Sequence, residues 1–315
     1  FPPFEKTELP KRRKKTILWK RCIKMAEPYQ IRSDFADEII SADIQSKTYE
    51  HIEKKNDYIR SNYIKVLCDE NELGKHKGDY VSIECRDLDD HVVRENMIDA
   101  IQENLQHMSD NMHVTLKKIL VVGLGNRFIT SDALGPQAAN EILVTAHLYE
   151  HEDPAYLKGT RNVAVLQPGV MGQTGLESLS IVQSVAQSYQ PDLVIAIDAL
   201  ATRNIARINR VVQINNTGIQ PGSGVGNHRM SLCEKSLHIP VIAIGVATVT
   251  SIGAILHETL EVSGEEKQHI LQKIQDSNYL NLVVTPKSMD DELKHLVYIV
   301  SESLNRFLHP NYEQL

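Results

Sequence analysis

Two aspartates stand where a carboxyl group could take part in catalysis. Asp198 ends the apolar run 193–197, and Asp132 lies in a loop that leads into a stretch of helical spacing. A carboxylate at the end of a buried strand loses hydration, so it needs hydrogen bonds, a partner charge or a shared proton. Two such groups close together split their pKa values, and this pair could activate water against an amide bond. The structural alternatives are a helix N-cap for Asp132, in competition with Ser131, and a carboxylate held by backbone amides for Asp198.

Three glycine-rich, polar segments are expected to gather near these aspartates. They are residues 123–136, 168–175 and 217–227, and the first two follow predicted strands. In open α/β sheets, ligands bind outside the carboxyl ends of the strands, where such loops meet. The candidates for substrate or oxyanion contacts in or next to these loops are Asn126, Gln173, Asn227, His228 and Arg229.

Several other kinds of site are not supported by the residue patterns. Gly123 and Gly125 follow a predicted strand, but Phe128 replaces the third glycine of a dinucleotide-binding loop, and the chain has no Gly-Lys-Ser/Thr phosphate loop. The four cysteines contain no Cys-x-x-Cys pair, which argues against a zinc knuckle or a disulfide framework and favours reduced, cytoplasmic thiols. We therefore predict neither a metal nor a cofactor.

The elements that must position these residues alternate between strands and helices. Helical spacing is seen at 135–148, 175–189 and 288–308, and the uncharged stretch 239–256 reads as a buried strand followed by a glycine-bearing loop rather than a membrane span. The more polar part, 29–112, offers one alternating strand at 79–85. This rhythm predicts an α/β fold with a mostly parallel sheet covered by helices on both faces. Short apolar runs typical of buried strands occur at 118–122, 162–166, 192–197, 210–214, 240–246 and 281–285.

Charge is distributed unevenly along the chain. The 315 residues carry a net charge of −7, yet residues 1–26 contain nine Lys and Arg against two Glu. This basic leader, on a body with a net charge of −14, could be a solvated tail, a polyanion-binding arm or a pro-segment held by the body. The acidic balance of the whole argues against a protein that coats nucleic acid, and no secretory signal opens the sequence.

Several long motifs occur in order along the chain. They are VVGLGNRFITSDALGP (121–136), PGVMGQTGLES (168–178), PDLVIAIDALATR (191–203), TGIQPGSGVGNHR (217–229), IPVIAIGVATV (239–249) and LVVTPKSMD (282–290). Together they resemble the germination proteases of spore-forming bacteria, and the resemblance extends over nearly the whole chain.

This resemblance implies an endopeptidase that degrades small acid-soluble spore proteins during germination. It implies a fold similar to the hydrogenase maturation peptidases (phosphorylase/hydrolase-like) and an atypical aspartic mechanism whose two essential aspartates fall on Asp132 and Asp198. It also implies a homotetramer in the cytoplasm of the spore core, with no membrane and no direct nucleic-acid partner.

The family is made as zymogens that cleave themselves near the N-terminus. The family's cleavage sites combine a small hydroxyl residue, an acid, a large apolar residue, Ala, a small or polar residue and Glu, and residues 33–38 (SDFADE) resemble that pattern. We therefore predict self-processing between Asp34 and Phe35. The predicted organisation is a basic pro-segment, 1–34, and a single α/β peptidase domain, 35–315, with a polar N-terminal part at 35–115 and a glycine-loop core at 116–315.

Two positions depart from the family pattern and keep alternatives open. Asn216 and Ser251 stand where the family usually has aspartates, and loss of acids near a carboxylate site could alter its pKa values. One alternative is a catalytically inactive peptide-binding paralogue. Another is a nickel-dependent peptidase of the hydrogenase-maturation type, with acids at the same two strand ends and a histidine. A third is DNA binding by the basic leader.

Overall fold

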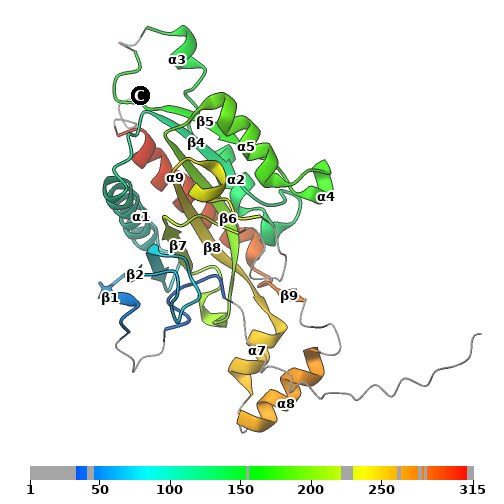
Figure 1. Cartoon of the computed structure of the whole chain (residues 1–315). Helices are drawn as coiled ribbons and strands as arrows, with labels where there is room; N and C mark the ends of the chain where they lie inside the picture. The colour runs from blue at the N-terminus through cyan, green and yellow to red at the C-terminus, as the bar shows by residue number, and fades with distance from the viewer. Residues whose placement is uncertain are drawn as a thin grey trace, which may run out of the picture.

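The computed structural model describes residues 33–40, 46–153, 156–220, 230–260, 264–275, 279 and 282–310. Within these ranges, nine strands form one sheet in the order β1-β2-β3-β7-β8-β6-β4-β5, and β9 pairs with β8 (Figure 1). The strands are β1 (Tyr49–Lys55), β2 (Ile59–Val66), β3 (Gly78–Cys85), β4 (Lys118–Gly123), β5 (Asn162–Leu166), β6 (Leu193–Thr202), β7 (Val211–Asn215), β8 (Val241–Ser251) and β9 (Val283–Val284).

The sheet is mixed, so the prediction of an α/β fold is confirmed but that of a mostly parallel sheet is wrong. Strands β5, β4, β6 and β8 run parallel, whereas β1, β2, β3, β7 and β9 pair antiparallel with their neighbours. Parallel neighbours need a crossover of a dozen or more residues. Only residues 203–210 separate β6 from β7, which is too short for such a crossover, so the chain turns back antiparallel.

Helices cover both faces of the sheet, as predicted. The first face packs against α1 (His91–Asn111), α2 (Leu134–Asn140) and α9 (Met289–Leu308), and its core includes Ile197, Ile244 and Leu296. On the second face, α5 (Ser178–Tyr189) lies against a core that includes Ala196 and Ala243 (Figure 1). Successive side chains of a strand point to opposite faces. Each central strand therefore supplies both cores, which explains its continuous apolar run.

The remaining helices have at most 12 residues. They are η1 (Thr130–Asp132), α3 (Leu148–His151), α4 (Met171–Thr174), η2 (Ile205–Arg207), α6 (Glu234–Leu237), α7 (Ile252–Thr259) and α8 (Gly264–Gln275). The segment after β8 is therefore the helix α7 and not the predicted glycine-bearing loop, since the Ser251 hydroxyl accepts a hydrogen bond from Ala254 N (3.1 Å) and caps it.

The helix predicted over 135–148 ends early, at Asn140, because the backbone that follows is hydrogen-bonded to a side chain of α9. The Asn305 amide accepts a hydrogen bond from Leu143 N (2.9 Å) and donates one to Glu141 O (3.0 Å). Backbone groups that would have continued the helix are thus bonded to α9. In the polar part of the chain, the alternating segment 79–85 is the strand β3, as predicted, whereas β1, β2 and α1 were not resolved as separate elements from the sequence.

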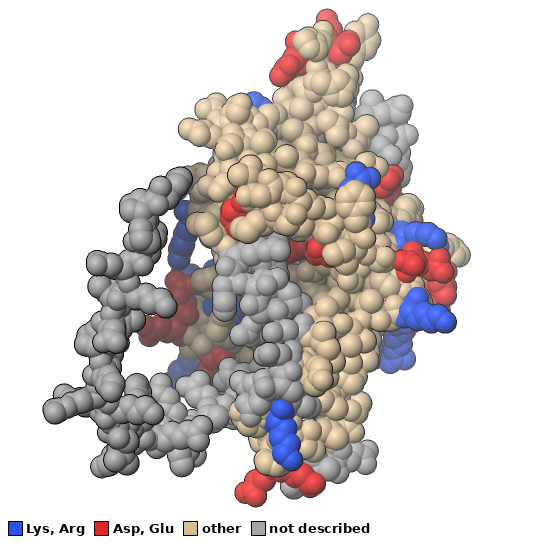
Figure 2. Space-filling view, turned by 90° about the vertical axis from the view of Figure 1, so that its right-hand side faces the viewer, with Lys and Arg blue, Asp and Glu red and all other residues tan. Residues whose placement is uncertain are grey.

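Figure 2 shows how Lys, Arg, Asp and Glu side chains are distributed over one face of the molecule. On the face drawn in Figure 2, acidic side chains gather at the top and bottom, the ends that carry α3 and α8 in Figure 1. Along the right-hand edge, basic and acidic side chains alternate. None of the helices among the described residues is long and apolar enough to cross a membrane. Residues 1–32, which contain the basic leader, lie outside the described ranges.

Candidate functional site

Asp198 lies inside strand β6 and not at its end, which corrects the prediction. β4 stops at Gly123, opposite Ile197, while β6 and β8 continue together as far as Thr202 and Thr250. Asp198 pairs with Gly245 of β8 just beyond the point where β4 leaves the sheet, and it is 3% exposed. Asp198 thus lies just past the carboxyl end of β4, although β6 itself continues for four more residues.

Strand alternation assigns Asp198 to the second face of the sheet. Val194, Ala196 and Leu200, at even spacing along β6, belong to the core beneath α5, whereas Ile195 and Ile197 belong to the opposite core. Gly245 leaves room beside it for the Leu200 side chain, whose Cδ1 would lie 2.3 Å from a Cβ at that position.

Asp132 ends the short helix η1 at the same edge of the sheet. Its carboxylate Oδ2 accepts a hydrogen bond from Asn126 N (2.8 Å), and its carbonyl accepts a second bond from the same N–H (3.0 Å). The N-cap interpretation is wrong, because the residue at the N-cap of α2 is Ala133 and not Asp132. Gly125 has φ +115°, and a Cβ there would lie 2.2 Å from Asp132 O, so only glycine suits this turn.

The loop that carries Asp132 passes directly beside the strand that carries Asp198. Leu124 N donates to Ile197 O (2.8 Å), and a Cβ at Gly135 would lie 2.5 Å from the same oxygen. The helix η1 contacts β6 and β8, where the Thr248 hydroxyl donates to Ser131 O (2.8 Å). The structure thus brings the two predicted aspartates into one region of the sheet edge.

Two of the predicted contact residues are hydrogen-bonded to each other. Gln173 Nε2 donates to Asn126 Oδ1 at 2.7 Å, which joins the second glycine loop to the first. Asn126 is also the residue whose N–H binds Asp132, so this amide pair continues the polar network from the aspartate outwards. The other predicted contacts, Asn227, His228 and Arg229, lie outside the described residues.

The chain's own residues 33–40 are docked against the second face of the sheet. Asp34 pairs with the end of β6, since its N–H donates to Ala201 O (3.0 Å) and its Oδ2 accepts from Ala201 N (2.8 Å). Two residues later, Ala36 N donates to Oε1 of Gln213 in β7 (3.0 Å). The peptide from Asp34 to Ala36 therefore spans from β6 to β7 on the face to which Asp198 belongs.

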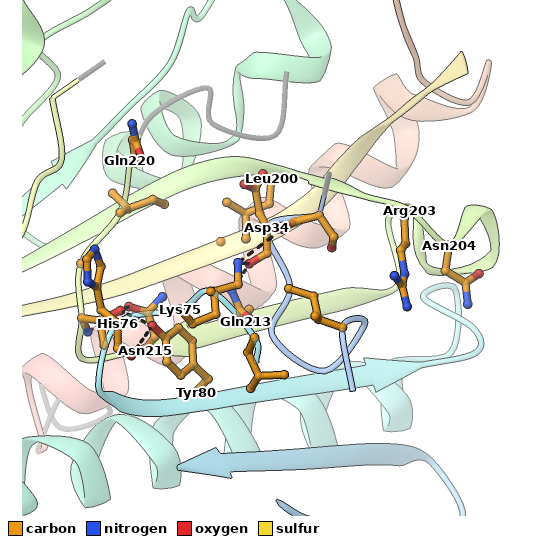
Figure 3. A pocket seen from close by; sticks show the side chains of 18 of the residues that line it. Asp34, Lys75, His76, Tyr80, Leu200, Arg203, Asn204, Gln213, Asn215 and Gln220 are labelled. Carbon is orange, nitrogen blue, oxygen red and sulfur yellow. Dashed lines mark hydrogen bonds between the residues drawn. The ribbon is translucent and has the colours of Figure 1, made fainter. Parts of the chain in front are cut away.

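The carbonyl oxygen of Asp34 accepts two hydrogen bonds from side chains. Lys75 Nζ lies 2.9 Å away and Gln213 Nε2 lies 3.1 Å away (Figure 3). Gln213 pairs with Gly245, which in turn pairs with Asp198, so Gln213 and Asp198 occupy one row across three strands. At about 4.8 Å between strands, their backbones are about 10 Å apart.

The residues after Asp34 are also held individually. Phe35 is fully buried in the core of the second face, and the Arg207 guanidinium lies 5.0 Å from its ring centre. Arg207 Nη2 contacts Asp37 Oδ2 at 2.7 Å and Nη1 contacts Glu38 Oε1 at 3.0 Å, while Nε forms an ion pair with Glu84 (3.2 Å). Burial alone would lower the pKa of Arg207, but the three carboxylates outweigh it and hold that pKa above its ordinary value.

Next to this docked segment lies a cavity of about 950 Å³, lined in part by Asp34, Lys75, Tyr80, Leu200 and Gln213 (Figure 3). Burial lowers the pKa of Lys75, although Asp34, Glu38 and Asp37 oppose that shift. Burial also raises the pKa of Tyr80 to about 12, and its hydroxyl donates to His76 O (3.0 Å). In the part of the chain that the structure describes, no cluster of three or more His, Cys, Asp or Glu side chains could hold a metal ion.

Lys75, Gln213 and Arg207 were not predicted from the sequence. Lys75 lies in the polar turn between β2 and β3, and Arg207 in the short connection after β6. Charged residues in polar connections usually lie in solvent. The partners of Lys75, Arg207 and Gln213 lie 41 to 179 positions away in the sequence, which no local pattern indicates.

Comparison with known sequences assigns the chain to a family. A family model described as germination protease matches residues 27–263. The chain belongs to the germination protease family. The germination protease of Caldanaerobacter subterraneus subsp. tengcongensis is 37% identical over 82% of this chain and 87% of its own length, and that of Clostridium tetani is 34% identical over 81% and 86%. The Oceanobacillus iheyensis protein with the same name is 32% identical over 90% and 95%.

Membership of the germination protease family makes the chain an endopeptidase of spore germination, and it confirms the resemblance read from the motifs. Asn216 and Ser251, where aspartates were expected, each have a local structural role. The Asn216 amide accepts from Asp79 N (2.8 Å) and donates to Asp79 Oδ2 (3.2 Å), where a carboxylate would face another carboxylate. Ser251 caps α7. These contacts do not favour an inactive paralogue.

Proposed function

We propose that this chain is an aspartic endopeptidase that cuts its own peptide bond between Asp34 and Phe35. Its other substrates are small acid-soluble spore proteins that carry the same pattern of residues. The observation that carries the proposal is the docking of Asp34 and Phe35 across β6 and β7, on the face of the sheet to which Asp198 belongs. The peptide bond between Asp34 and Phe35 is therefore held where the peptide bond of a substrate would bind.

In the proposed reaction, the two carboxyl groups of Asp132 and Asp198 share one proton. The ionised group takes a proton from a water molecule, whose oxygen then bonds to the carbonyl carbon of Asp34. The protonated group gives its proton to the amide nitrogen of Phe35 as the C–N bond breaks. The products are a carboxyl group on Asp34 and an amine on Phe35, and no metal or cofactor takes part. The carboxyls titrate as a coupled pair, so the acid and base roles belong to the pair.

The contacts of residues 33–38 explain the sequence pattern expected of substrates. The acid before the cleaved bond binds the backbone N–H of Ala201 through its carboxylate. The large apolar residue after the bond fills a fully buried position, as Phe35 does. The acid four residues after the position of Asp34 meets Arg207, as Glu38 does. Each of these contacts would be available to a spore protein that replaced the chain's own segment.

Residues 1–34 then form the pro-segment, and cleavage leaves Phe35 as the new N-terminus of a peptidase domain, 35–315. Removal of 1–34 frees the carboxyl side of the cleaved bond, where Asp34 lines the cavity. In this proposal the protein is a homotetramer in the cytoplasm of the spore core, as the family resemblance implies. Light scattering on the processed protein tests the tetramer.

The test is cleavage of a peptide that contains Thr-Glu-Phe-Ala-Ser-Glu by wild-type protein, beside Asp132→Asn and Asp198→Asn variants. We expect cleavage after the Glu by the wild type, loss of residues 1–34 by intact mass, and neither event in the variants. Cleavage that persists in both variants would refute the aspartic mechanism. Binding without cleavage, even after residues 1–34 are removed, would identify an inactive paralogue, and inhibition by chelators would point to the nickel mechanism.

A further inference from the structure

Two side-chain donors converge on the carbonyl oxygen of Asp34. Lys75 Nζ (2.9 Å) reaches it from the turn between β2 and β3, and Gln213 Nε2 (3.1 Å) reaches it from β7 (Figure 3). These donors come from elements about 140 residues apart in sequence, and one of them carries a charge. To hold the backbone of residues 33–38 in place, one hydrogen-bond donor per carbonyl oxygen is enough, and that donor can be neutral. A second, cationic donor at the same oxygen suits an oxygen that becomes negative.

This oxygen is the one that would gain charge during cleavage after Asp34. When water bonds to the carbonyl carbon, the carbonyl oxygen becomes an oxyanion, and donors 2.7–3.1 Å from it stabilise the transition state. We infer that Lys75 and Gln213 form the oxyanion hole of this peptidase. The inference rests on the proposed function, because it assigns the reacting carbonyl to Asp34. The aspartates then move protons, while Lys75 and Gln213 bind the negative charge.

Lys75 is held by its own turn in the position that this role requires. The Asn71 side chain accepts a hydrogen bond from Lys75 N (3.3 Å) and donates one to Lys75 O (2.7 Å). The ammonium makes a further bond to Ser33 O (3.3 Å), the carbonyl before the reacting one. Lys75 is partly buried, and burial lowers its pKa, the direction expected when an ammonium loses part of its hydration. A poorly hydrated cation interacts more strongly with a new negative charge than one in water.

Gln213 is oriented by the substrate segment itself. Its Oε1 accepts a hydrogen bond from Ala36 N (3.0 Å), so its amide nitrogen must turn toward Asp34 O. The side chain is 3% exposed, and its strand is paired on both sides, with Ser82 of β3 and Gly245 of β8. Both donors are thus fixed before the reaction begins, which is what makes oxyanion stabilisation effective.

The test measures self-processing in the full chain, where the substrate segment is already docked. Lys75→Met removes the charge at similar length, and Gln213→Glu keeps an acceptor for Ala36 N but loses the donor to Asp34 O. Loss of residues 1–34 is followed by intact mass, and hydrogen exchange of the Ala36 amide reports whether the segment stays docked. Lys77→Met is the matched control, since Lys77 is exposed and lies two positions further along the same turn.

We expect each variant to process at least about 100-fold more slowly than the wild type, the usual effect of removing one oxyanion donor. Ala36 exchange should stay within a few-fold of wild type, and Lys77→Met should process normally. A processing rate that falls only as far as Ala36 protection falls would assign the two residues to docking and overturn the inference. Unchanged processing in the variants would also overturn it.

The Lys75→Arg variant and the wild type itself distinguish the remaining outcomes. Lys75→Arg retains a cationic donor and should recover part of the rate lost in Lys75→Met, whereas a rate as low as that of Lys75→Met would contradict a charge-based role. The Lys75→Arg variant also tests the role of the charge if Lys75→Met proves to have a lowered melting temperature. A wild type that never loses residues 1–34 and cuts no peptide refutes the proposed function, and the oxyanion hole with it. A wild type that cuts while all variants cut equally refutes the oxyanion hole alone.

Discussion

The strongest prediction concerns Arg207, whose side chain is only 5% exposed and contacts three carboxylates. Arg207→Met keeps the apolar stem but leaves Asp37 and Glu38 buried without their cation. Removal of one partner from a buried ion pair costs about 3–5 kcal/mol, because the remaining charge is uncompensated. The docked segment can avoid this cost by leaving its site, so the loss should appear in the free energy of docking rather than of global unfolding.

This free energy can be measured by hydrogen exchange at Ala36. Its amide bonds to the buried Gln213 side chain, so it exchanges only when residues 33–38 detach. A loss of 3 kcal/mol corresponds to about a 150-fold faster exchange, since each tenfold change is worth about 1.4 kcal/mol. We therefore expect Arg207→Met to raise the exchange rate of Ala36 at least about 100-fold. Self-processing should slow to the extent that the detached form comes to outnumber the docked form. Intact mass on the same samples verifies that the segment is still attached.

Arg210→Met is the matched control. Arg210 lies three residues further on and pairs with Glu292 of α9 (2.9 Å), not with the docked segment. It should lower the melting temperature but leave Ala36 exchange near the wild-type rate. The reasoning would be refuted by an Ala36 exchange rate that changes less than tenfold in Arg207→Met, or by equal effects of the two variants. Either result would mean that Arg207 does not hold the segment.

Three other predictions follow from single positions. Gly125→Ala should lose about 1–3 kcal/mol in urea unfolding and slow peptide cleavage, because φ is +115° there, whereas Gly172→Ala, with open space around it, should not. Asn216→Asp should lose about 1–2 kcal/mol at pH 7, and less near pH 4 where carboxylates protonate, because it faces Asp79. Burial lowers the pKa of His309, so as the pH falls the unfolded chain binds a proton at this residue before the folded chain does. The free energy of unfolding should therefore decrease below about pH 6.5, by at most about 1.4 kcal/mol per pH unit. His309→Gln should remove this contribution to the pH dependence.

Much of the fold could be predicted because its signals are local. The run 162–166 is the strand β5, and the apolar stripe over 288–308 is the helix α9. Each of these patterns of apolar residues lies within one continuous segment, so the strand or helix can be recognised without knowing what it packs against. Strand direction could not be predicted in this way. The run 210–214 reads like any buried strand, and the connection before it is recognised as too short for a crossover only once the structure shows that β6 continues to Thr202.

The candidate site was predicted in part for the same reason. Asp132 and Asp198 stand beside apolar runs and inside long family motifs, so both the physical argument and the resemblance select them. Their presence at one edge of the sheet agrees with that expectation, while their catalytic role stays a prediction. The N-cap interpretation of Asp132 was wrong because its partner, Asn126 N, is fixed by the turn at Gly125 rather than by the following helix.

By itself, the sequence determined the family, the positions of the central strands and the two aspartates, since each is encoded in contiguous residues. Only the tertiary structure decided which strands reverse, and which polar side chains surround the bond after Asp34. Gln213 and Arg207 become buried, and Lys75 partly buried, because the chain folds residues 33–38 over β6 and β7, at the cost of dehydrating their polar groups. Whether a polar group finds a compensating partner depends on contacts between distant segments, and that information exists only in the folded chain.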